Sequence, residues 1–180
     1  MIRLLLPLMM LATGAAGPPP ADAVLRTLVE GDAARAKGDH DALLGTAQAL
    51  RTLGAVPAEG QDDLAAQWTR EAHGNGASGP NFRGRALGPA YRHGSLGAGG
   101  SVTVRQLFLA GQRAQISIAP ARGAANLSMR VRGANGATLC AKPVDGAQAD
   151  CAWLPLFTDR FDIVIENSGA VPADFYLVVR

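Results

Sequence analysis

Apolar and polar residues alternate in short segments along the stretch from Gly99 to Arg180. A period of two gives a strand one buried face and one face in water. The apolar positions are Val102, Val104, Leu107, Leu109, Ala114, Ile116, Ile118, Leu127, Met129, Val131, Phe161, Ile163, Ile165, Tyr176 and Val178. Turn-forming residues separate the segments at 110–111, 122–123, 133–136, 145–146 and 168–172. This spacing favours an antiparallel, jelly-roll-like β-sandwich over a parallel sheet, whose crossovers need helical segments between the strands.

An export signal is predicted at the start of the chain, over residues 1–16. Arg3 precedes the apolar run from Leu4 to Ala12, and small residues follow that run. The run is too short to anchor the chain across a bilayer, and its small-residue end is typical of a cleavage site. We expect cleavage after Ala16, with Ala23 as the alternative. No transmembrane anchor is then expected, and the mature protein belongs in the periplasm or outside the cell.

Helical periodicity dominates residues 17–74. Capping residues and glycine stops predict three helices: one from Asp22 to Gly38, one from Asp39 or Asp41 to Gly54, and one over about 62–72. The segments 22–27 and 41–46 also resemble each other. Two such copies are either a plain antiparallel helical hairpin or the remnant of a helical repeat, since a stable repeat array needs about three copies.

These patterns predict an α+β protein in which a helical hairpin of two to three helices precedes the sandwich. Residues 75–87 are rich in glycine with a proline, which is typical of a linker. The sandwich domain is predicted over 88–180, with Tyr91 and Leu96 in its first strand. A fragment that begins near Gly88 is expected to fold alone.

The two cysteines, Cys140 and Cys151, flank a turn-rich segment. Export would place them in an oxidising compartment, so we expect a disulfide that joins neighbouring strands at the base of a hairpin. Two buried thiols are the alternative. Trp153 should pack over or near this pair. The residues expected to be buried are Ile116, Ile118, Leu127, Met129, Val131, Phe161, Ile163, Ile165 and Val178.

A resemblance to a known family covers about the last half of the chain. The residues that carry it are Leu109-Ala110-Gly111-Gln112-Arg113, Ile116-x-Ile118, Leu127-x-Met129-x-Val131, Gly136, Cys140, Cys151, Pro155, Thr158, Phe161-x-Ile163-x-Ile165, Asn167, Gly169 and Tyr176-x-Val178. This order resembles the bacterial pre-peptidase C-terminal domain, a small β-sandwich often appended to secreted peptidases. Some members of that family bind calcium through clustered Asp and Asn, and no such cluster surrounds the Gly111-Gln112 turn.

No sequence motif indicates catalysis, a metal or a cofactor. The formal net charge is +2 and both signs occur in each half, so a nucleic-acid partner is disfavoured. Gly94-Ser95-Leu96-Gly97 approaches a nucleophile elbow, but His93 stands in place of its first glycine and no helical pattern follows. His40, His73 and His93 are far apart, and none has a second ligand type at metal spacing.

The sequence therefore favours an exported, non-catalytic accessory or binding protein whose sandwich contacts an envelope or extracellular protein, a peptide or a glycan. A structural module of an envelope assembly is one alternative, and a hydrolase with a scattered site is the other. The candidate ligand-binding residues are Arg105, Arg113, Arg130 and Arg132, because neighbouring strands could align their guanidinium groups toward carboxylates.

Overall fold

The computed structural model describes residues 21–73 and 88–180. Three helices come first, α1 (Ala23–Lys37), α2 (His40–Thr52) and α3 (Leu64–His73), with a short strand β1 (Val56–Pro57) between the last two. The remaining strands are β2 (Ala90–Leu96), β3 (Ser101–Phe108), β4 (Ala114–Pro120), β5 (Leu127–Arg132), β6 (Thr138–Pro143), β7 (Ala149–Trp153), β8 (Asp159–Asn167) and β9 (Ala173–Val179). The predicted signal peptide and the predicted linker at 75–87 lie outside the described residues.

The helices begin and end where their capping residues predict. The Asp22 carboxylate accepts hydrogen bonds from the backbone N–H groups of Val24 and Leu25, at 2.9 and 3.1 Å, and so caps α1. Gly38 ends this helix in the left-handed conformation at φ 68°, which costs glycine little. Asp39 then caps α2 through the N–H of Ala42 at 3.0 Å.

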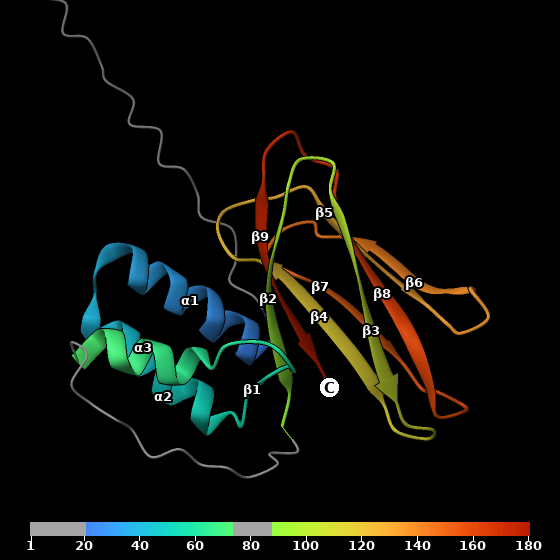
Figure 1. The fold of residues 1–180 in the computed structure, drawn as a ribbon, viewed down its shortest axis with the longest axis horizontal. Coiled ribbons are helices and arrows are strands. Elements are labelled where there is room, and N and C mark those ends of the chain that lie inside the picture. The colour runs from blue at the N-terminus through green and yellow to red at the C-terminus, as the bar shows by residue number, and fades with distance from the viewer. Residues whose placement is uncertain (1–20, 74–87) are drawn as a thin grey trace, which may run out of the picture.

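The strands form two packed sheets, which confirms the predicted α+β class (Figure 1). One sheet has five strands in the order β1-β2-β9-β4-β7, and the other has four in the order β3-β8-β5-β6. All strand pairs are antiparallel except β1 with β2. The two-residue β1 was not predicted, because so short a strand carries no alternation to detect.

The core between the sheets contains most of the apolar residues that the alternation selects, but Val102, Leu107 and Leu109 are exposed. Ile116, Ile118, Ile163 and Ile165 are fully buried there, and every other residue of the predicted core is buried as well. Val178 is not part of this core, because its side chain is buried on the other face of the five-stranded sheet. Trp153 packs at this core against Phe108 in a T-shaped arrangement and against Phe161 in a tilted one.

A second apolar cluster joins the helices to the outer face of the five-stranded sheet. Tyr91, Tyr176 and Val178 project from that face into a cluster with Leu25 and Trp68 of the helices. The Tyr91 hydroxyl accepts a hydrogen bond from the first residue of α3 at 2.9 Å, and burial raises the pKa of Tyr91 to about 12. The molecule therefore has three layers, with the five-stranded sheet in the middle (Figure 1).

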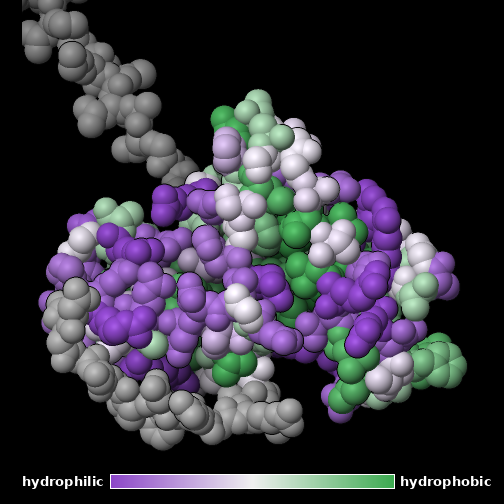
Figure 2. Space-filling view, in the orientation of Figure 1, coloured by the Kyte–Doolittle hydropathy of each residue, from purple (hydrophilic) through white to green (hydrophobic). Residues whose placement is uncertain are grey.

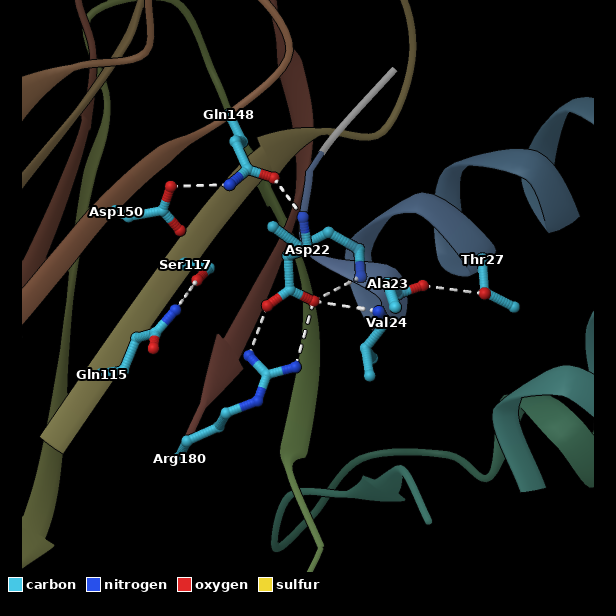
Figure 3. A network of polar contacts seen from close by, with 10 residues as sticks. Asp22, Ala23, Val24, Thr27, Gln115, Ser117, Gln148, Asp150 and Arg180 are labelled. Carbon is cyan, nitrogen blue, oxygen red and sulfur yellow. Dashed lines mark hydrogen bonds and ion pairs between the residues drawn. The ribbon is translucent and has the colours of Figure 1, made fainter. Parts of the chain in front are cut away.

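A polar network ties the start of α1 to the last strands (Figure 3). Arg180 donates hydrogen bonds to both carboxylate oxygens of Asp22. The backbone N–H of Asp22 donates to Gln148 at 2.9 Å, and Gln148 donates to Asp150 at 2.6 Å. Burial alone would raise the pKa of Asp22, but the bonds from Arg180 and from the helix N-terminus hold it below its usual range.

The structure pairs Cys140 with Cys151, with their Cα atoms 6.0 Å apart. The expected hairpin is wrong, however, because β6 and β7 belong to different sheets. Residues 144–148 carry the chain from one sheet to the other, and each of the two strands is the last in its sheet. The disulfide therefore closes one side of the sandwich by joining two edge strands across the core.

Candidate binding site

Three of the four candidate arginines share one surface. Arg105 on β3 and Arg130 and Arg132 on β5 project from the outer face of the four-stranded sheet, because their neighbours along each strand face the core. Asp162 of β8 lies between Arg105 and Arg132 in the strand register. Arg113 lies apart from them, in the loop between β3 and β4.

Acidic residues of β8 partly neutralise this surface. Arg105 donates two hydrogen bonds to Asp162, at 2.7 and 3.3 Å, and Arg130 lies 3.9 Å from Glu166. The hydrogen bond from Arg105 lowers the pKa of Asp162 below its usual range. The face is therefore a mixed ion-pair surface, and Arg105 stands at its border on the edge strand β3.

A groove of about 350 Å³ opens beside Arg105, between strand β2 of one sheet and strand β3 of the other. It is lined on the β2 side by Arg92, His93, Gly94 and Ser95, and on the β3 side by residues 102–105. Phe175 contributes an apolar wall, and Gly94 leaves it room because a Cβ there would come within 2.5 Å of the ring. The groove thus combines two cations, an apolar wall and the edges of two sheets.

Strand β3 presents unpaired backbone groups to this groove. Among the described residues it is an edge strand that pairs with β8 alone. The N–H of Asn167 donates to the carbonyl of Gly100 at 2.8 Å, and this bond fixes which β3 residues face β8. By the alternation of an antiparallel ladder, the N–H and C=O groups of Thr103 and Arg105 then point away from the sheet. An extended peptide could pair with them.

Residues 58 and 61 already form hydrogen bonds with most of the edge of strand β2 that faces away from β9. The N–H of Ala58 donates to the carbonyl of Tyr91 at 2.8 Å, and the N–H of His93 donates to the Gln61 side chain at 2.9 Å. Ser95 lies beyond this cover. The free edge on the groove therefore belongs mainly to β3.

Sequence reasoning did not select Arg92 as a candidate binding residue and did not find the groove. The strand alternation could have indicated it: Leu96 is buried in the core between the sheets, so Gly94 and Arg92 face the same side of β2. An arginine on the core side of an edge strand must reach the open side of the sandwich, since a buried unpaired charge is costly.

The residues singled out for chemistry are not brought together. Ser95 lies within strand β2 and not on a strand-to-helix turn. His40 lies on α2, His73 on α3 and His93 on β2, where its ring packs against Tyr176 at 5.0 Å between centroids. Across 21–73 and 88–180 there is no cluster of three or more potential metal ligands. Within the same ranges, no helix is both long and apolar enough to cross a membrane.

Neither a protein-family model nor a curated protein matches the sequence. Solved structures match it at low identity. A mitogen from Yersinia pseudotuberculosis aligns with 51% of this chain and 83% of its own, at 13% identity and a TM-score of 0.44. The pre-peptidase C-terminal domain of a Bacillus anthracis collagenase aligns with 50% of this chain and 87% of its own, at 12% identity and a TM-score of 0.41.

A third similar structure is PliG from Aeromonas hydrophila, a periplasmic inhibitor of g-type lysozyme. It aligns with 70% of this chain and 96% of its own, at 16% identity and a TM-score of 0.38. The Bacillus anthracis domain belongs to the family that the sequence resembles. We assign the architecture of this chain from its own strand order and register, and not from these matches.

Proposed function

We propose that the protein is an exported, non-catalytic accessory protein that binds an extended peptide segment carrying carboxylates. The peptide lies in the groove between β2 and β3 and adds a strand to the free edge of β3. The observation that carries this proposal is the run of outward backbone groups at Thr103 and Arg105 beside a cationic groove.

Strand addition suits this groove because an edge strand offers backbone donors and acceptors in a fixed register. Main-chain hydrogen bonds give affinity in this mode, and the side-chain surroundings give specificity. Alternate side chains of the peptide would face Phe175 and Val104 on the core side. The others would face the outer surface near Arg105.

Charge favours an acidic peptide over a basic one. Arg92 and Arg105 both line the groove, and no carboxylate lines it among the residues that the structure describes. Arg105 is held by Asp162, whereas Arg92 forms no ion pair within the described residues. A peptide carboxylate near Arg92 would gain a charge-assisted hydrogen bond.

The same lining argues for binding without catalysis. It includes His93 and Ser95 but no carboxylate that would orient an imidazole as a base. Export is supported by the apolar N-terminal segment and by the disulfide between Cys140 and Cys151. The location that follows is the periplasm or the cell exterior.

Two labelled peptides test the proposal, one alternating valine with glutamate and one alternating valine with lysine. Fluorescence anisotropy with the mature chain should give a Kd at least about tenfold lower for the glutamate peptide, and added salt should weaken its binding. Equal affinity for the two peptides, or no binding of either, contradicts the proposal and leaves a glycan or a structural role.

Variants locate the binding. Thr103→Pro removes one outward N–H at an edge where proline is tolerated, and it should raise the Kd at least about tenfold. Arg92→Ser should weaken binding without touching the backbone. Arg113→Ser is the control for charge, since Arg113 lies outside the groove, and it should bind like the wild type. Serine at both Arg130 and Arg132 tests whether the rest of the outer face takes part.

A further inference from the structure

Large apolar side chains are exposed to solvent at one end of the sandwich, on and beside the loops 109–113 and 154–158. They are Leu107, Leu109, Leu154, Leu156 and Phe157, here called the apolar tip. Leu156 is 82% exposed and Phe157 78%. Figure 2 shows hydrophobic atoms at the lower right, where Figure 1 places the β3–β4 and β7–β8 loops. Single exposed apolar residues are ordinary on a protein, but a gathering of this kind indicates a contact surface.

The two loops are bonded to each other, so the apolar tip is one surface. The N–H of Gly111 donates to the carbonyl of Pro155 at 2.9 Å. The N–H of Ala110 donates to the Thr158 hydroxyl at 3.0 Å. These bonds hold the exposed side chains at the end of the two sheets without burying them.

Cations border the apolar tip. Arg113 ends the first loop, and Arg160 lies directly opposite Leu107 in the β3–β8 register. Asp159 adjoins the second loop, and its carboxylate accepts the backbone N–H of Arg160 at 2.7 Å. With two arginines and one aspartate, the border is net positive.

We propose that the apolar tip inserts into the interface of a bilayer that contains anionic phospholipids. Leucine and phenylalanine side chains at loop ends can enter the boundary between headgroups and acyl chains, and arginines beside them can bind lipid phosphates. A projecting end of a sandwich fits a deformable lipid surface. None of the five residues of this surface is among the residues that line the β2–β3 groove.

Vesicle binding tests the proposal directly. The mature chain should co-sediment with vesicles of phosphatidylglycerol and phosphatidylcholine, and much less with phosphatidylcholine alone. Replacing Leu156 and Phe157 together with serine should lower the partition coefficient at least about tenfold, because each side chain loses its transfer into the interface. Arg113→Ser with Arg160→Ser should lower binding to the anionic vesicles about fivefold for each charge.

The control is Val171→Ser, which removes an apolar side chain that is 69% exposed in the loop between β8 and β9, outside the apolar tip. It should leave vesicle binding unchanged. Phe157→Trp gives a second readout, since its emission should shift to the blue with anionic vesicles. Wild-type protein that stays in the supernatant overturns the proposal. The proposal is also overturned if the Leu156 and Phe157 double variant binds vesicles as well as the wild type does. It is overturned too if the only effect of the double variant is to convert a dimer to a monomer in light scattering.

Discussion

Asp22 joins two parts of the molecule through one carboxylate. It caps α1 and it pairs with Arg180, the last residue of the chain. Asp22→Ala should therefore lower the free energy of unfolding by about 1–2 kcal/mol, at the upper end for a lost helix cap. Asp39→Ala is the matched control, because Asp39 caps α2 but forms no ion pair within the described residues, and it should cost less. Urea melts followed by circular dichroism measure both, and equal losses would show that the ion pair contributes nothing.

The depressed pKa of Asp22 also predicts a pH dependence. A carboxyl group with a lower pKa in the folded state stabilises the fold above its unfolded pKa of about 3.9, and this contribution disappears as the pH falls through the folded value. Asn caps helices well, so Asp22→Asn removes mainly the charge. The wild type should be the more stable of the two at pH 7, and the difference should close below about pH 4. A difference that persists unchanged at pH 2 would contradict the assignment.

Gly31 is required by the packing of α1 on α3. A Cβ at this position would come within 2.2 Å of the Trp68 ring, which is fully buried. Gly31→Ala should destabilise the protein by about 1–3 kcal/mol, the usual cost of overpacking. Gly45→Ala in α2 is the control, because it meets open space and should stabilise by up to about 1 kcal/mol. In thermal melts, Gly31→Ala should lower the Tm and Gly45→Ala should raise it.

At this scale the sequence predicts what is local. Asp22 and Gly38 could be recognised as helix ends because a cap acts within a few residues along the chain. The contact of Gly31 with Trp68 could not be recognised, because it depends on how two helices pack. Arg92 could be recognised only in part. Strand alternation places it on the core-facing side of β2, but only the fold shows that a groove opens there.

At the scale of elements, the alternation predicted the strands whose two faces differ. Strands β5 and β8 alternate buried and less buried residues, and each was predicted. Strand β4 is buried at six of its seven positions, but Ile116 and Ile118 still alternate with Gln115 and Ser117 in the sequence, so it was predicted too. The sheet to which β6 and β7 belong was not predictable, because a five-residue connection can form either a hairpin or a crossing between sheets. Their cysteines could be paired by compartment and count, but not placed across the core.

Joining two edge strands gives the disulfide a clear role. Replacing Cys140 and Cys151 together with serine should lower the free energy of unfolding by about 3 kcal/mol in the chain-entropy model, with the β spectrum retained. Wild-type protein taken from the periplasm without reductant should show no free thiol on labelling. Complete thiol labelling of that material would contradict export into an oxidising compartment as well as the bond.

The whole molecule has two cores that share one sheet. Within the described residues, the core between the sheets includes no helix residue, whereas the second core forms between the helices and residues such as Tyr91, Tyr176 and Val178. Strand β1 comes from the helical region but pairs with β2. The sequence predicted both halves because each has its own periodicity. It did not predict their contact, which depends on the outer face of the five-stranded sheet.

The predicted domain boundary at Gly88 can be tested with a fragment of residues 88–180. It keeps every residue of the core between the sheets and the disulfide, so its circular dichroism spectrum should retain the β signature. It also exposes Tyr91, Tyr176 and Val178, whose burial contributes about 1.5–3 kcal/mol for each large apolar side chain. The fragment should therefore unfold at lower urea than the mature chain and bind more of a hydrophobic dye than the mature chain does. A fragment without β signal would show that the helical layer is required for the sandwich to fold, because the middle sheet then depends on both of its neighbours.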